Sequence, residues 1–109
     1  MTDEIWLVDF GVPFETEPGH RRPALVVGPP QRFGPEFPYR LVVPLTTTGR
    51  GLDLHVEIEA SPLTGIDRTS YAQCESLRSV SRRRLVHPIG RVSAAVAATT
   101  RRVLVELLG

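Results

Sequence analysis

Residues 28–38, with the sequence GPPQRFGPEFP, place the strongest restriction on how this chain can fold. Four of these eleven residues are prolines, which lack a backbone N–H and hold φ near −65°. The segment is therefore predicted to be a long loop. Apolar runs flank it at 23–27 and 39–45, and such runs bounded by turn-forming residues are typical of buried strands. We therefore expect short strands joined by long loops.

Further strands are predicted from the same periodicity. The predicted strands cover 4–10, 23–27, 39–45, 52–58 and 68–80, with a short extended piece at 86–92. Strict alternation in LDLHVEI predicts that the aliphatic side chains of this strand face the core and that Asp53, His55 and Glu57 face solvent. The glycine-containing stretch 46–51 is short enough to join 39–45 to 52–58 as a hairpin.

One helix is predicted, at the end of the chain. Ser93 is a suitable N-cap for a helix over 94–108. Pro44 implies that its strand lies at a sheet edge or contains a bulge, because proline cannot donate to the ladder. About five strands and one terminal helix favour a mainly β (α+β) fold, a small, curled antiparallel β-barrel formed by one domain over 1–109.

Composition restricts the compartment and the chemistry. At 109 residues, with 41% hydrophobic and 23% charged residues, the chain has the profile of a soluble globular domain. It has neither the apolar run of about 18–20 residues that a membrane helix needs nor a signal-peptide pattern, so we expect a cytoplasmic protein without membrane contact. The single cysteine, Cys74, excludes an internal disulfide and predicts a small, half-buried strand residue.

Charge is unevenly distributed along the chain. Residues 1–19 carry five acidic residues and no basic one, whereas residues 78–102 carry seven arginines and no acidic residue. All thirteen basic residues are arginines, whose planar guanidinium suits phosphate and carboxylate groups. This local basic field indicates an anionic partner, or a surface that pairs with the acidic end of another subunit.

Several kinds of catalytic site find no support in the sequence. His20, His55 and His87 lie far apart without metal-ligand spacing. No glycine-rich phosphate loop follows a predicted strand, and neither Cys74 nor any serine lies in a nucleophile elbow. We therefore expect neither a metal ion nor another cofactor.

Polar residues do gather at predicted strand ends. Arg21 and Arg22 directly precede the strand 23–27, and Thr46, with two further threonines, directly follows 39–45. If these two strands pair in antiparallel fashion, Arg22 and Thr46 emerge at the same end of the sheet. A guanidinium and a hydroxyl there favour a phosphate site. The alternative is structural, with threonines that form a turn and an arginine that caps a strand.

Four segments, in order, resemble the MazF/PemK family of toxin endoribonucleases. They are IWLVDFGVPFETEPGHRRPALVVGP, VVPLTTTGRG, AQCESLRSVSRRRL and IGRVS, the last before the final helix. The pairing of RPALVV with PLTT is the most specific part. The resemblance implies an SH3-like barrel that forms a homodimer and cuts single-stranded RNA without a metal. It also implies a cognate antitoxin whose C-terminal segment occupies the RNA groove.

The resemblance also implies site residues. Arg22, Thr46 and Glu17 match the family's catalytic positions, as the arginine before proline, the threonine after PL and the acidic loop residue. The residues implied to bind RNA are Thr16, His20, Arg21, Thr47, Gln73, Glu75, Ser76 and Arg78. The chain departs from the family pattern in two places: Glu15-Thr16 replaces a common Gly-Ser, and Ser76 replaces a glutamine.

A metal-free mechanism follows from RNA chemistry, since the 2′-hydroxyl is itself a nucleophile. Arg22 would stabilise the charge that develops on the phosphate, Thr46 would orient it, and Glu17 would accept the 2′-hydroxyl proton. Arg22 or His20 would protonate the leaving 5′-oxygen, and the product would end in a 2′,3′-cyclic phosphate. Other readings are a non-catalytic SH3-like binding module and a gyrase-poisoning toxin of the same fold.

Aromatic residues in the loops have two readings. Phe14, in the loop before Arg21, and Phe33 and Phe37, in the proline-rich loop, could stack on bases or serve only as loop anchors.

Overall fold

The computed structural model describes residues 1–12, 15 and 19–109 of the chain. Its seven strands are β1 (Glu4–Asp9), β2 (Arg21–Gly28), β3 (Tyr39–Thr46), β4 (His55–Ile58), β5 (Ser70–Gln73), β6 (Arg78–Ser81) and β7 (Leu85–Arg91). Three short 3₁₀ helices, η1 (Gln31–Phe33), η2 (Cys74–Ser76) and η3 (Arg82–Arg84), connect them, and α1 (Ala94–Leu108) ends the chain. Every pairing is antiparallel, so the predicted mainly β fold with a C-terminal helix is confirmed.

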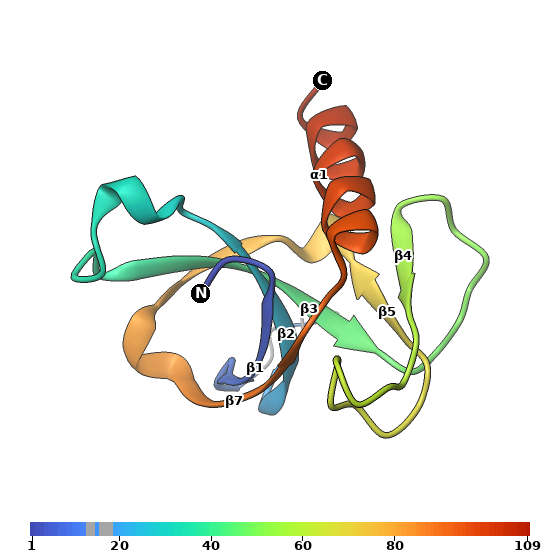
Figure 1. Cartoon of the computed structure of the whole chain (residues 1–109), viewed down its shortest axis with the longest axis horizontal. Coiled ribbons are helices and arrows are strands. Elements are labelled where there is room, and N and C mark those ends of the chain that lie inside the picture. Colours follow the sequence, from blue (N-terminus) through green and yellow to red (C-terminus); the bar gives the residue numbers. More distant parts are fainter. Residues whose placement is uncertain (13–14, 16–18) are drawn as a thin grey trace.

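The strands form one curled sheet in the order β4-β5-β3-β2-β1-β7, with β6 paired to β3 beside β5 (Figure 1). The long strand β3 is central, because β2 pairs along one side and both β5 and β6 pair along the other. The barrel-like curl leaves β4 and β7 at the two ends of the order.

Pro44 lies in this central strand rather than at an edge. It pairs with Ala24 of β2 on one side. On the other side, β6 pairs with β3 as far as Val42 and β5 pairs from Leu45 onward. The proline therefore lies where β3 changes neighbour, a position at which a missing backbone donor breaks no ladder.

Two predictions about connections are wrong. The segments 39–45 and 52–58 do not form a hairpin, because β5 lies between β3 and β4. The predicted strand 68–80 is interrupted at Cys74, where η2 separates β5 from β6 so that both halves can pair with β3. Strand β4 starts only at His55, so Leu52, expected in the core, is 45% exposed.

Hydrophobic side chains bury both faces of the sheet. Helix α1 covers one face, where Val43, Leu45 and Ile58 belong to a core cluster with Val103 and Leu104 of the helix. A second cluster, on the opposite face of β1, β2 and β3, contains Val8, Phe10, Ala24, Val26, Val42 and Val80.

The predicted cap is confirmed, since Ser93 Oγ accepts the Val96 N–H at 3.2 Å. Ser93 thus satisfies one of the free N–H groups at the start of α1.

Candidate phosphate-binding site

Two backbone hydrogen bonds join Phe10 and Gly11 to His20, just before β2 begins. The Phe10 N–H donates to the His20 carbonyl at 2.8 Å, and the His20 N–H donates to the Gly11 carbonyl. His20 itself is exposed and has a left-handed φ of 58°. Strand β2 then starts at Arg21, two residues before the predicted start, because Arg21 and Arg22 pair with Asp9 and Val8 of β1.

Arg21 and Arg22 point to opposite faces of β2, as alternation along a strand requires. Arg21 is exposed, and its Nε lies 3.9 Å from Asp9 Oδ2. Arg22 is half-buried, and its Nε is buried without a hydrogen-bond partner among the described residues. A buried cationic donor without a partner is costly, which makes Arg22 a candidate for binding an anion.

Thr46 lies on the same face as Arg22. Ala24 pairs with Pro44, and the same register continued by two residues sets Arg22 opposite Thr46, as expected from the sequence. Thr46 Oγ1 accepts the backbone N–H of Thr48 at 3.2 Å. Its hydroxyl proton is therefore directed away from that N–H and can be donated to a ligand. A guanidinium and a hydroxyl donor at one sheet end suit phosphate oxygens.

The same face continues across β5 and β4. Thr46 pairs with Tyr71, and Tyr71 pairs with Glu57, so alternation brings these side chains to the Arg22 face. A Cβ atom added to Gly49 would stand 3.0 Å from the Tyr71 ring. The loop after β3 therefore crosses close over Tyr71, where glycine is the residue that fits.

His55 lies on this face but is not exposed to solvent, contrary to the prediction. Its side chain is only 2% exposed, and its Nε2 lies 3.0 and 2.9 Å from the two carboxylate oxygens of Glu75. Gln73 is the cross-strand partner of His55. His55 Nδ1 and Gln73 Oε1 are both buried without a partner among the described residues. Together, the buried side-chain atoms of His55 and Gln73 and the exposed carboxylate of Glu75 form a polar group beside the candidate site.

Arg78 extends the polar surface toward β6. It pairs with Val42 of β3, which places it on the Arg22 face, and its Cζ lies 5.3 Å from the Phe10 ring centroid. Ser76 is half-buried in η2 between Glu75 and Arg78. His55, Glu57 and Tyr71 were not predicted as site residues, although the alternation in LDLHVEI does assign His55 and Glu57 to the face away from the first core cluster.

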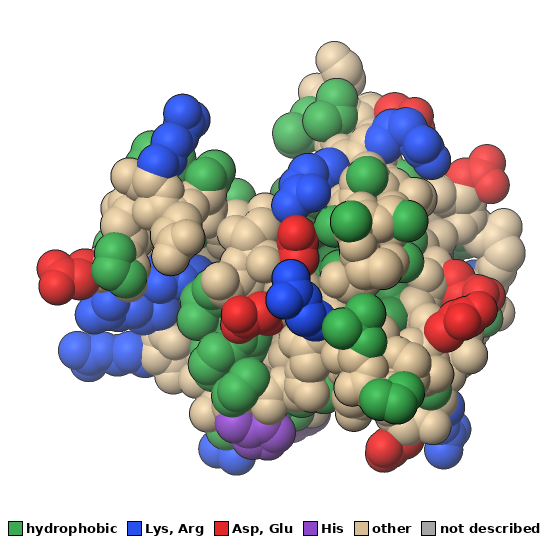
Figure 2. All heavy atoms as spheres, viewed as in Figure 1, with side chains coloured by type: hydrophobic (Ala, Val, Ile, Leu, Met, Phe, Trp, Pro, Cys, Tyr) green, Lys and Arg blue, Asp and Glu red, His purple; other side chains and the backbone are tan. Residues whose placement is uncertain are grey.

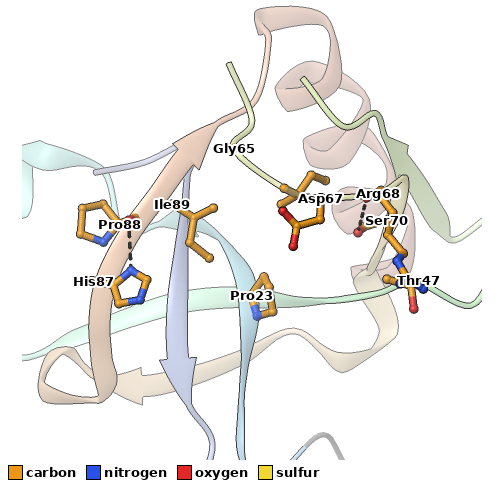
Figure 3. Close-up of a pocket in the computed structure, with 10 residues that line it drawn as sticks. Pro23, Thr47, Gly65, Asp67, Arg68, Ser70, His87, Pro88 and Ile89 are labelled. Carbon is orange, nitrogen blue, oxygen red and sulfur yellow. Dashed lines mark hydrogen bonds between the residues drawn. The ribbon is translucent and has the colours of Figure 1, made fainter. Parts of the chain in front are cut away.

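Thr47 points to the other side of the sheet. It lines a cavity of about 490 Å³ with Pro23, Asp67, Arg68 and His87 (Figure 3). Pro23 and Thr47 directly follow Arg22 and Thr46, so this cavity lies behind the candidate site across the end of the sheet. The structure therefore separates Thr47 from the Arg22 face.

Comparisons with known proteins identify the family of this chain. Residues 2–108 match the family model described as PemK-like, MazF-like toxin of type II toxin-antitoxin system. The chain belongs to this toxin family. "Endoribonuclease MazF9" of Mycobacterium tuberculosis is 35% identical over 101 residues, which cover 87% of this chain and 84% of the relative.

Solved structures of toxins show the same fold. MazF (Form-I) from Deinococcus radiodurans superposes with a TM-score of 0.83 at 26% identity, covering 99% of this chain and 94% of that one. A MazE-MazF structure (Form-II) from the same organism gives 0.78 at 26% identity, with the same two coverages. The fold of this toxin-family chain is thus that of solved MazF proteins.

Two residues that the family resemblance implies, Thr16 and Glu17, lie outside the described residues, as does Phe14. Among the residues that the structure describes, no three His, Cys, Asp or Glu side chains come together as a candidate metal site. Within the same part of this toxin-family chain, no helix has the length and apolar character needed to cross a membrane.

Proposed function

We propose that this chain is the toxin of a type II toxin–antitoxin pair and acts as a metal-independent endoribonuclease on single-stranded RNA. One observation carries the proposal. Among the residues that the structure describes, Arg22 Nε is buried without a partner, and it lies on the same face as the Thr46 hydroxyl, which accepts the Thr48 N–H. Family membership and a relative named as an endoribonuclease support this reading.

In the proposed reaction, the RNA 2′-hydroxyl oxygen attacks the adjacent phosphorus, and the bond from phosphorus to the 5′-oxygen breaks. The 2′-hydroxyl proton passes to a general base, for which we propose Glu17, and the leaving 5′-oxygen takes a proton from Arg22 or His20. The products are a 2′,3′-cyclic phosphate and a 5′-hydroxyl. Of the other residues that the resemblance assigns to RNA binding, Arg78 lies on the Arg22 face and would contact a flanking nucleotide, whereas Arg21 and Thr47 lie on the other side of the sheet.

Arg22 acts mainly by charge stabilisation. As the 2′-oxygen adds, a second negative charge develops on the non-bridging oxygens, and a guanidinium held out of water interacts more strongly with this dianion than with the ground-state monoanion. Thr46 donates its proton to one of these oxygens and fixes the phosphate for in-line attack. Neither step needs a metal ion.

We also propose that the toxin works as a cytoplasmic homodimer and that a cognate antitoxin inhibits it by placing its C-terminal segment in the RNA groove. The MazE-MazF structures from Deinococcus radiodurans, whose toxin resembles this chain, support an antitoxin partner. The local excess of arginine in residues 78–102 suits both RNA and an acidic peptide.

Incubation of the purified chain with a long single-stranded RNA, with and without EDTA, tests the activity. We expect cleavage in both, 2′,3′-cyclic phosphate at the new ends, and no cleavage by Arg22→Ala. Sequencing of the new 5′ ends then identifies the cleaved motif. Intact RNA together with trapped gyrase–DNA complexes would contradict the proposal and favour a gyrase poison.

A further inference from the structure

The loop between β2 and β3, residues 29–38, projects from the sheet as an arm (Figure 1). Three aromatic side chains lie exposed on the arm and at its junction with β3: Phe33 is 52%, Phe37 37% and Tyr39 53% exposed. The ring centroids of Phe33 and Phe37 lie 6.0 Å apart, and those of Phe37 and Tyr39 6.4 Å apart. The three rings therefore form one continuous aromatic surface rather than scattered exposed residues.

Arginine side chains hold this arm in place. The guanidinium of Arg40, which is only 9% exposed, donates to the carbonyls of Pro35, Phe37 and Tyr39 at 3.0, 2.5 and 2.8 Å. Arg82 also donates its backbone N–H to the Pro38 carbonyl at 2.9 Å and a guanidinium N–H to the Pro35 carbonyl at 3.2 Å. A surface fixed in this way loses little conformational entropy when it binds a ligand.

Three consecutive arginines connect the arm to the end of β1, which pairs with the start of β2. Arg82 contacts the arm, Arg83 follows it, and Arg84 donates to the Asp9 carbonyl at 3.2 Å. Asp9 is the cross-strand partner of Arg21, the residue before Arg22. Helix η3 thus bridges the aromatic surface and the end of β2 where Arg22 lies.

The charge of this region is strongly positive. Residues 29–41 and 79–84 together contain five arginines and a single acidic residue, Glu36. Arginines (blue) gather on the same side of the molecule as the arm in Figure 2. The guanidinium of Arg32 also lies over the Phe33 ring, 5.2 Å from its centroid. Exposed aromatic rings beside a basic track form a surface typical of proteins that bind single-stranded nucleic acid.

We propose that this surface binds the single-stranded RNA substrate beyond the cleaved phosphate, with bases stacked on Phe33, Phe37 and Tyr39 and phosphates contacted by η3. The proposal rests on the proposed ribonuclease activity and adds an extended substrate site to it. From Arg22 to Gly28, β2 spans about 20 Å. The arm therefore contacts nucleotides several positions from the scissile bond, so the length of the RNA determines whether the arm is engaged.

Cleavage of short and long RNAs tests the proposal. The short RNA carries the cleaved motif alone, and two long RNAs extend it by several unstructured nucleotides on the 5′ or the 3′ side. We expect the natural chain to show a higher kcat/KM for one long RNA than for the short one. In Phe33→Ala/Phe37→Ala, the long-to-short ratio falls at least about fivefold, since one base stack is worth roughly that factor or more. Loss of folded protein cancels in this ratio.

A matched control removes exposed apolar side chains elsewhere. Val105 and Leu108 of α1 are 66% and 80% exposed, so Val105→Ala/Leu108→Ala should keep the natural ratio. Arg83→Gln gives a second readout. The binding partner is a long RNA with a 2′-deoxy nucleotide at the cleaved position, which cannot be cut. For this RNA, the slope of log K against log salt concentration should decrease in magnitude by about one.

The outcomes separate the two proposals. If the natural chain cleaves short and long RNAs equally well, or if the arm variant keeps the natural ratio, the extended site is wrong while the ribonuclease stands. An arm variant that keeps the ratio but loses the dimer or the antitoxin would make the arm a protein contact instead. If the natural chain cleaves none of the RNAs, the ribonuclease proposal itself fails.

Discussion

Arg21 and Asp9 are cross-strand partners whose Nε and Oδ2 atoms lie 3.9 Å apart. The adjacent Arg22, on the opposite face, keeps a buried Nε without a partner among the described residues. Two consecutive arginines thus differ sharply in environment. Arg21 has a carboxylate neighbour at the surface, whereas Arg22 is the residue proposed to bind an anion, and this difference makes Arg22 the better target for mutation.

Replacement of Arg22 by alanine should separate activity from stability. We expect kcat/KM for RNA cleavage to fall at least about 10²-fold, as when an oxyanion donor is lost. The free energy of unfolding should stay unchanged or rise by about 1 kcal/mol, because the mutation removes a buried donor that has no partner among the described residues. Cleavage kinetics and urea denaturation measure the two effects. Arg102→Ala, on exposed α1 surface, is the control, and a folded, active Arg22→Ala would refute the mechanism.

Replacement of Thr46 tests the hydroxyl donor. Thr46→Val keeps the shape of the side chain but removes the hydroxyl that accepts the Thr48 N–H, so we expect kcat to fall by roughly tenfold or more. Thr46→Ser keeps the hydroxyl and should retain most of the activity. Single-turnover cleavage rates compare the three proteins, and equal rates for the serine and valine variants would show that the hydroxyl has no role.

The contact between His55 and Glu75 should contribute to stability. Glu75→Ala removes the partner of His55 Nε2, and the imidazole, whose Nδ1 already lacks one among the described residues, is then left buried without a hydrogen bond. We expect the free energy of unfolding to decrease by about 1–3 kcal/mol, with a smaller decrease for Glu75→Gln. Urea denaturation measures this loss. The control is Glu57→Ala, which removes an exposed carboxylate from β4, the strand that carries His55. A loss no larger than that of the control would contradict the assignment.

Removal of the helix cap should weaken α1. Ser93→Ala removes the acceptor of the Val96 N–H and should lower the free energy of unfolding by about 1 kcal/mol, whereas Ser93→Gly should lower it by only a few tenths. Thermal and urea denaturation measure both. Alanine and glycine variants of equal stability would mean that the cap contributes little.

Stability at high pH should depend on Cys74. Burial, and to a smaller extent the Glu75 carboxylate, raises the pKa of Cys74 from 9.0 to about 11. Below pH 9 the thiol is protonated in both the folded and the unfolded chain. Between these two values only the unfolded chain releases its proton, so the free energy of unfolding decreases as pH rises. Cys74→Ala should show a shallower decrease in urea denaturation, and parallel pH profiles would contradict this.

Local features of the fold could be predicted from the sequence. Helix α1 and its Ser93 cap follow from a serine before an uninterrupted helical segment, and the antiparallel pairing of β2 with β3 is confirmed. Strand order could not be predicted, because periodicity identifies a strand but not its neighbour. The sequence therefore predicted a hairpin between β3 and β4, whereas β5 pairs between them.

The candidate site shows the same limit. Antiparallel pairing predicted that Arg22 and Thr46 share one end of the sheet, and the register agrees. Alternation also assigned His55 to the face away from the first core cluster, but not its burial. That burial depends on Glu75 in η2, a break in the predicted strand that the sequence pattern does not reveal.

The paired strands β2 and β3 have consequences for how such toxins diversify. Their paired register fixes Arg22 relative to Thr46 at one end, while the arm occupies the other end. Insertions or deletions in the arm should therefore leave the relative placement of Arg22 and Thr46 unchanged, whereas one residue inserted within β2 would turn Arg22 to the opposite face. Under the proposed role of the arm, lineages can vary the arm, and with it the RNAs that they bind, without a matching change in Arg22 and Thr46.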